Sequence, residues 1–390
     1  MSNSRAEPSL PAVAAMVSVG FIPLNLLPFT VVGYASGLHL DSVDAGVLGT
    51  IEMSGAMLGS LASIPLIRKV SLGRLAVLAT LAAVAFELLS CAMHSFAEMG
   101  VARALVGVAC GMVLASGNAV AAAAHDPARY YMRVLAIQSA LTIFIWSAMP
   151  RLLSAGNQVG VFIGAAFALL ALALVMMLSG NRLGLTSVAT TATSMPNTAS
   201  PHTAAGPAVV VMALLAVFAC CMRDGVAWTF SDRIAIQVGL SDFGQTMLYV
   251  GIGAIGLIGL LASSRLDIWK HPVMNVMGAI IFASATTTGL LFSHDWRVFV
   301  ALALPWAAAQ FLALSFLTGL AAEFDSSGRL SAATGAAFQC AYAVAPALAG
   351  FVYVRIGLGA VGALATLLSA TTLVAGSWLA SRAVLHRRTR

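Results

Sequence analysis

The chain has 390 residues, of which 60% are apolar and only 9% carry a charge. Soluble domains contain about 45–50% apolar and about 25% charged residues, so this composition excludes a soluble enzyme, a disordered chain and a disulfide scaffold. The net charge of +6 does not indicate nucleic-acid binding, because the basic residues lie in short loops and in the C-terminal tail. In a bilayer such residues report orientation, and we predict an integral membrane protein.

Twelve apolar segments are long enough to cross a hydrocarbon core of about 30 Å, which needs about 20 helical residues. Their backbone groups find no water in lipid, so they must form helices, and the predicted fold class is all-α. The first segment is too long for the core of a signal peptide, and we expect it to remain as a span. The predicted spans are 11–37, 43–66, 72–93, 97–121, 132–153, 158–179, 208–231, 243–264, 272–293, 297–321, 330–353 and 358–382.

The distribution of basic residues predicts the orientation. With the N-terminus inside, 14 of the 20 Lys and Arg face the cytoplasm, and only Arg151, Arg297 and Arg355 face the outside. This asymmetry predicts that both termini are cytoplasmic. We expect a multi-pass protein of the inner cell membrane.

One long break separates the sixth and seventh spans. Residues 181–206 are rich in Thr, Ser, Ala and Pro, and Arg182 is the only Lys, Arg, Asp or Glu among them. Such a composition cannot build a core. It predicts a cytoplasmic linker between two six-helix bundles, residues 1–180 and 207–390.

The two halves contain similar sequence features. Residues 40–46 (LDSVDAG) precede the second span as residues 240–244 (LSDFG) precede the eighth, each with a helix-capping acid or serine. Arg133 and Pro150 recur as Arg329 and Pro346, both offset by 196 residues. This pattern indicates a parallel duplication, the plan of many alternating-access transporters.

These features resemble the major facilitator superfamily over essentially the whole chain. Arg103–Gly111 (RALVGVACG) looks like the family's R-x-x-x-G motif, and Leu72-Gly73-Arg74 is similar to the end of its D-R-x-G-R loop. The acidic position of that loop is Val70 here. Span five offers only Met149-Pro150-Arg151 in place of the drug/proton antiporter signature, which argues against multidrug efflux.

The resemblance implies twelve transmembrane helices in two pseudo-symmetric six-helix bundles. It also implies a substrate site between the halves, with the first, fourth, seventh and tenth helices lining it. The default functional unit of this family is a monomer. A small-molecule substrate, protons and the lipid bilayer are then the partners, and no cofactor or metal is expected.

Five charged side chains lie well inside predicted spans, away from the span ends, and a charge costs about 2.5–3.5 kcal/mol at the bilayer centre. We therefore expect them to face a cavity, a partner or one another. They are Glu52, Glu87, Arg103, Arg223 and Asp224.

Arg103 is the preferred functional residue, because a buried guanidinium can hold a substrate carboxylate or poise a neighbouring acid. The alternative is a permanent ion pair with Glu52 or Glu87. Glu52 is the candidate proton carrier, or else a static hydrogen-bonding group. Arg223 and Asp224 point about 100° apart on one helix, so we expect one to line the cavity and the other to pair sideways.

Further polar and aromatic side chains are candidates for substrate contact, although hydrogen bonding between helices explains them equally well. These are Asn25, Trp228, Gln310, Gln339 and Tyr342. The candidate gate residues are Asp232, Arg233 and, through the loop resemblance, Arg74.

The sequence offers no catalytic signature, and we predict that the protein is not an enzyme. Gly251–Gly256 spells G-x-G-x-x-G but lies within a span, which favours helix packing over nucleotide binding. The five cysteines fall in apolar stretches without metal-ligand spacing.

We predict a secondary transporter of a small organic solute, preferably an organic anion, coupled to protons. One alternative is proton-driven efflux of amphipathic drugs or toxicants. Another is a transport-inactive sensor or a membrane-embedded enzyme.

Overall fold

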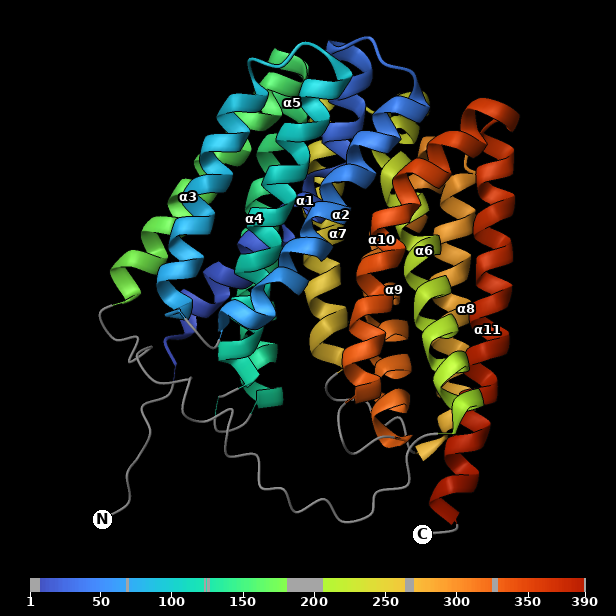
Figure 1. Ribbon diagram of the computed structural model, residues 1–390. Helices are drawn as coiled ribbons and strands as arrows, with labels where there is room; N and C mark the ends of the chain where they lie inside the picture. The colour runs from blue at the N-terminus through green and yellow to red at the C-terminus, as the bar shows by residue number, and fades with distance from the viewer. Residues whose placement is uncertain are drawn as a thin grey trace, which may run out of the picture. The chain divides into compact units, whose positions relative to one another are not determined.

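The structure, a computed structural model, describes residues 8–67, 70–122, 124, 127–180, 206–263, 270–324 and 329–388. This part of the chain forms eleven α-helices (Figure 1). They are α1 (Leu10–Gly37), α2 (Ser42–Ile67), α3 (Leu72–Ser90), α4 (Phe96–Ala122), α5 (Pro127–Gly180), α6 (Pro207–Gln237), α7 (Asp242–Ser263), α8 (Pro272–Leu291), α9 (Trp296–Phe324), α10 (Arg329–Ile356) and α11 (Leu358–Arg388).

All eleven helices are long and apolar enough to cross a membrane. The predicted all-α, multi-pass class is therefore confirmed. The twelve predicted spans fall on eleven helices because 132–153 and 158–179 both lie on α5. Residues 181–205 of the predicted linker lie outside the described residues.

Helix α5 reverses its direction near its middle. A straight helix of its 54 residues would be about 81 Å long, far more than a bilayer requires. Its helical geometry breaks at Gly156 (φ −143°, ψ 15°) and Asn157 (φ 50°, ψ −140°). A Cβ placed on Gly160 would collide with the carbonyl of Leu152, eight residues earlier. In a straight helix these two residues would be about 12 Å apart along the axis. The limbs 127–155 and 158–180 therefore pack against each other.

The chain divides into two compact units. Unit 1 comprises Met1–Leu38 and Ile51–Thr198, and unit 2 comprises His39–Thr50 and Ala199–Arg390. Residues 39–50 belong to unit 2 through contacts within it, such as the 2.9 Å hydrogen bond from the Ala347 amide to Thr50 Oγ1. Helix α2 therefore begins in unit 2 and ends in unit 1.

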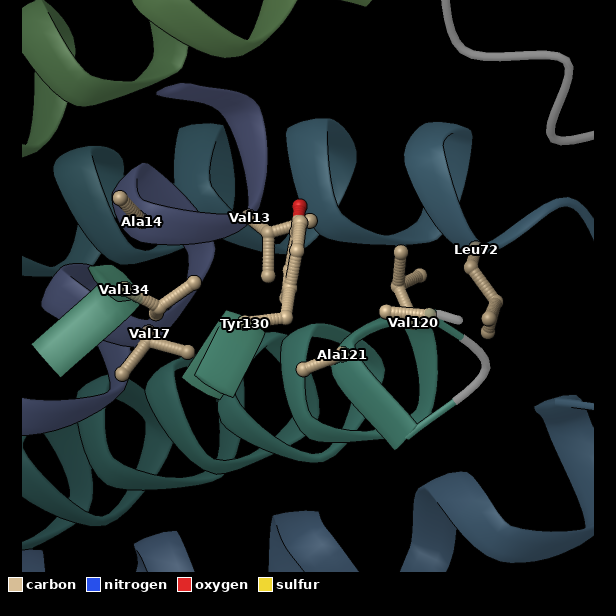
Figure 2. Packing of buried hydrophobic residues seen from close by; sticks show 9 residues of the cluster. Val13, Ala14, Val17, Leu72, Val120, Ala121, Tyr130 and Val134 are labelled. Atoms are coloured by element: carbon tan, nitrogen blue, oxygen red, sulfur yellow. The ribbon is translucent and has the colours of Figure 1, made fainter. Parts of the chain in front are cut away.

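In unit 1, α1 packs mainly against α5 and α4, and α3 packs against α4 and α5. Figure 2 shows one buried cluster where these helices meet, with the Tyr130 ring between side chains of α1 and α4. Its labelled members are Val13, Ala14, Val17, Leu72, Val120, Ala121, Tyr130 and Val134. Tyr130 is 3% exposed, and its hydroxyl donates to the Pro8 carbonyl at 3.1 Å, so the ring is buried while its polar end is paired.

In unit 2, α6 packs against α10 and α11 and also contacts α8 and α9, while α7 packs against α9. Gly251 and Gly256 of α7 lie against Leu304 and Ala307 of α9. Their small size permits this close approach. The helix-packing interpretation of the G-x-G-x-x-G pattern is thus confirmed.

The expected caps before the second and eighth predicted spans are present. Asp41 Oδ1 accepts hydrogen bonds from the amides of Val43 and Asp44 at 2.8 and 2.9 Å. Ser241 Oγ accepts from the Gly244 amide at 3.2 Å. Each side chain pairs backbone donors that the first helical turn leaves open.

Candidate functional site

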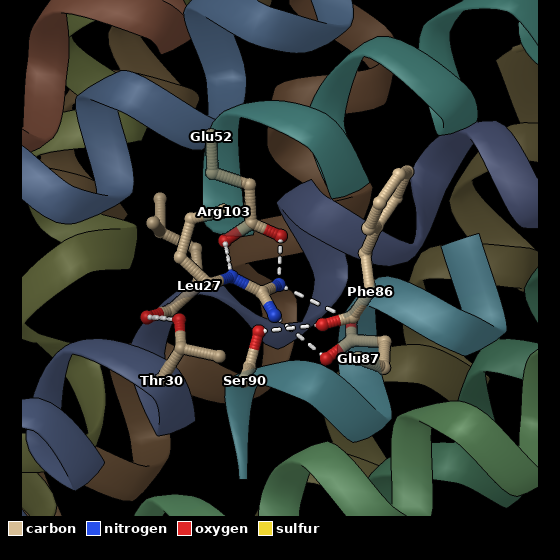
Figure 3. A network of polar contacts seen from close by, with 7 residues as sticks. All are labelled: Leu27, Thr30, Glu52, Phe86, Glu87, Ser90 and Arg103. Atoms are coloured by element: carbon tan, nitrogen blue, oxygen red, sulfur yellow. Dashed lines mark hydrogen bonds and ion pairs between the residues drawn. The ribbon is translucent and has the colours of Figure 1, made fainter. Parts of the chain in front are cut away.

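Unit 1 contains a buried network of two acids and one base. Figure 3 shows Arg103 of α4 between Glu52 of α2 and Glu87 of α3. Nε and Nη2 of Arg103 donate to Glu52 at 3.1 and 2.5 Å, and Nη1 and Nη2 donate to Glu87 at 2.6 and 3.1 Å. No member is more than 1% exposed. The Phe162 ring covers the guanidinium, with its centroid 5.0 Å from Cζ.

Glycines bring the helices of this network together. A Cβ on Gly107 of α4 would collide with the Glu52 carbonyl, and one on Gly111 would collide with the Ala56 carbonyl. Gly55 and Gly59 of α2 lie equally close to the backbone of α4. This small-residue packing holds Glu52 within reach of Arg103.

The sequence left ion pairing of Arg103 with Glu52 or with Glu87 as an open alternative, and Arg103 contacts both acids at once. Fully ionised, the three groups carry a net charge of −1. Three guanidinium nitrogens already contact carboxylates of the protein.

The buried arginine of unit 2 has different partners. Arg223 lies near the middle of α6 and is 0% exposed. Nη1 donates to Ser284 Oγ of α8 at 2.9 Å, and Nη2 donates to Gln310 Oε1 of α9 at 2.6 Å. Among the described residues no carboxylate forms an ion pair with it. Arg223 Nε and Gln310 Nε2 are both buried without a hydrogen-bond partner.

Asp224, the next residue of α6, has its own set of partners. Trp306 Nε1 of α9 donates to its Oδ1 at 2.7 Å, and the Tyr342 hydroxyl of α10 donates to its Oδ2 at 2.5 Å. The Trp228 ring lies 5.5 Å from the Trp306 ring. Arg223 and Asp224 thus contact different side chains, as their angular separation on the helix predicts.

The other substrate candidates lie apart from these two clusters. Asn25 of α1 donates to Thr142 Oγ1 of α5 at 2.9 Å, and its carbonyl accepts from Trp146 Nε1 at 3.0 Å. These contacts join helices within unit 1. Gln339 of α10 is half-buried.

The neighbouring gate candidates Asp232 and Arg233 have different side-chain partners. Asp232 is 0% exposed, and its Oδ1 accepts a 3.4 Å hydrogen bond from the Tyr249 hydroxyl of α7. Arg233 instead donates to Ser42 Oγ and lies over the Tyr353 ring, 4.6 Å from its centroid. Arg74 is exposed in the first turn of α3.

Three residues of these clusters escaped the sequence analysis: Ser284, Trp306 and Tyr249. A tryptophan or tyrosine within an apolar span signals a polar group that needs a partner when it is buried. That signal could have drawn attention to Trp306 and Tyr249. A serine in a transmembrane helix carries no comparable signal.

Within the described ranges no group of three or more His, Cys, Asp or Glu could hold a metal ion. The five cysteines are free thiols, and Cys110, Cys220 and Cys221 are buried. Cys220 Sγ lies 3.7 Å from Arg223 Nη2.

The fold and these clusters define an all-helical, multi-pass membrane protein with buried charges in each of its two units. No protein-family model matches the chain, and no curated protein matches it.

Proposed function

We propose that the protein is a secondary transporter that resembles the major facilitator superfamily. It moves a small organic anion across the membrane by alternating access and is coupled to protons. Unit 2 supplies the anion-binding group, Arg223, and unit 1 supplies the coupling acids.

The reversal of α5 supports this architecture. With the limbs 127–155 and 158–180 as separate crossings, the chain crosses the membrane twelve times, six times on each side of the proposed linker. Both termini then lie on the same face, the cytoplasmic one by the distribution of Lys and Arg.

The observation that carries the proposal is the lack of an acidic partner for Arg223. A charged side chain at the bilayer centre costs about 2.5–3.5 kcal/mol even on an insertion scale. Arg103 offsets this cost with two carboxylates, whereas Arg223 has only uncharged partners in the described chain. A carboxylate of the substrate supplies the missing charge and pairs Nε, which donates to nothing.

In this proposal Arg103 poises Glu52 and Glu87 and does not bind the substrate. Two acids share one arginine, so one proton neutralises the network. Movement of Glu52 relative to Arg103 would change the attraction that keeps its charged form, and this couples proton release to conformation.

Uptake of small carboxylic acids into vesicles containing the purified protein tests the proposal. Arg223→Gln is expected to lower uptake about 10–100-fold, because a hydrogen bond to a charged group contributes about 1.5–3 kcal/mol. Arg151→Gln changes an exposed arginine and is the matched control. Equal uptake by Arg223→Gln and Arg151→Gln would contradict the anion site.

The surroundings of Asp224 favour a second candidate function, the efflux of amphipathic cations. The carboxylate is only partly buried, and the rings of Trp306, Tyr342 and Trp228 lie near it. Acids and aromatic faces together attract organic cations.

The variants Asp224→Asn and Arg223→Gln distinguish the two candidate functions. Under efflux, Asp224→Asn makes cells sensitive to lipophilic cations, whereas Arg223→Gln leaves resistance intact. Under anion transport, Arg223→Gln lowers acid uptake about 10–100-fold, and cells carrying Asp224→Asn tolerate lipophilic cations like the wild type.

A further inference from the structure

A second acid of α6 lies eight residues after Asp224 and takes no part in the proposed anion site. Asp232 is 0% exposed, and its Oδ2 has no hydrogen-bond partner. Its Oδ1 accepts a single long hydrogen bond, 3.4 Å, from the Tyr249 hydroxyl. That hydroxyl also lies 3.2 Å from Ser231 Oγ.

Two titratable groups of α7, Tyr249 and Asp242, interact with Asp232, and neither supplies a positive charge. On its own helix, the adjacent Arg233 instead contacts Ser42 and the Tyr353 ring of α10.

Among the side chains that the structure describes, the basic groups of the remaining helices packed against α6 have other contacts. Helix α8 contains no titratable side chain. Arg297 of α9 lies over the Trp296 ring, and Arg355 of α10 lies over the Phe351 ring. On α11, Arg382 lies over the Trp378 ring, His386 stacks on Phe324, and Arg387 pairs with Glu323 of α9.

An ionised carboxylate in this position would be buried with one oxygen unpaired and no counterion. Burying such a charge is so costly that the group takes up a proton instead. We propose that Asp232 is a proton-binding group of unit 2. A proton from water adds to Oδ2, and Oδ1 remains the acceptor of the Tyr249 hydrogen bond.

Packed side chains connect this acid to the cluster around Asp224, the neighbour of Arg223 on α6. Asp224, Trp228 and Asp232 recur every four residues and lie along one side of α6. The Trp228 ring meets Trp306, a partner of Asp224, at 5.5 Å and Tyr249, the partner of Asp232, at 6.0 Å. A role for the Asp232 proton in driving transport rests on the proposed function, but the protonation itself does not.

Infrared spectroscopy of the full-length protein in lipid vesicles tests the inference without any substrate. With the aspartate carboxyl carbons labelled with ¹³C, the carboxylic-acid C=O stretch of aspartate is separated from that of glutamate. We expect Asp232→Asn to lose one aspartate band at neutral pH. Asp44→Asn, which changes an exposed aspartate of unit 2, should retain every band.

Tyr249→Phe provides a second reading that keeps Asp232 in place, should Asp232→Asn fail to fold. Loss of a hydrogen bond to a C=O raises its stretching frequency, so the same band should move to higher frequency. The inference would be overturned if Asp232→Asn kept every aspartate C=O band. It would also be overturned if the band kept its frequency in Tyr249→Phe. A protein that moves no organic acid would still show the band, so failure of the proposed function is distinguishable.

Discussion

The amide oxygen of Gln310 accepts a 2.6 Å hydrogen bond from Arg223, in the role that carboxylates play beside Arg103. Within the described chain, Arg223 therefore donates to no carboxylate. This difference distinguishes Arg223, which we propose binds an anion, from Arg103, which the protein has already paired with acids.

Replacing Gln310 with glutamate would give Arg223 a permanent counterion. We expect Gln310→Glu to abolish uptake of small carboxylic acids while the protein unfolds at the same temperature or higher. The isosteric change replaces a hydrogen bond from a charged donor to a neutral acceptor with an ion pair between two opposite charges. Vesicle uptake and thermal unfolding of the same preparation check both effects. If the role of Arg223 is purely structural, Gln310→Glu should take up carboxylic acids as fast as the wild type.

Removal of the shared base of unit 1 should be severe. Arg103→Gln leaves Glu52 and Glu87 buried without their cation, and breaking a buried pair in this way costs about 3–5 kcal/mol. In detergent, the unfolding temperature of Arg103→Gln should be much lower than that of the wild type, whereas that of Arg151→Gln should be unchanged. Glu87→Gln should cost less than Arg103→Gln, because Arg103 retains two contacts with Glu52. The reverse order would contradict the arrangement in Figure 3.

The contact between α2 and α4 should tolerate no side chain at Gly107. A methyl group there meets the Glu52 carbonyl, and overpacking of this kind costs about 1–3 kcal/mol. We expect Gly107→Ala to lower the unfolding temperature and to loosen the Glu52–Arg103 pair. Gly278→Ala is the matched control, since an added Cβ meets nothing within 4 Å. Equal stability of the two variants would show that α2 and α4 are not in backbone contact.

Chemical labelling can test the proposed orientation and the reversal of α5 together. In a chain freed of its five native cysteines, Asn157→Cys should react with a membrane-impermeant maleimide added to intact cells. Arg74→Cys, which is exposed but on the proposed cytoplasmic face, should react only after permeabilisation. Labelling of both positions from the same side would exclude the proposed orientation.

The helices were predictable because their signal is local. Long apolar runs with polar punctuation predict spans, and 72–93 and 272–293 correspond closely to α3 (Leu72–Ser90) and α8 (Pro272–Leu291). The capping roles of Asp41 and Ser241 were equally readable, since a cap depends only on residues within one turn.

The partners of the charged residues could not be read from the sequence. Arg103 and Glu52 are 51 positions apart, and only the packing of α2 on α4 brings them into contact. The sequence predicted that buried charges must find partners, but it could not show that one arginine takes two acids while Arg223 takes none.

The hairpin of α5 determines where the protein can be altered from outside. Only Gly156 and Asn157 depart from helical geometry between its limbs, so this corner has no slack. An epitope tag or fluorescent protein inserted there would unwind turns on both sides. Such an insertion would therefore disturb the packing of both limbs and could not serve as a neutral reporter of which side of the membrane the corner faces.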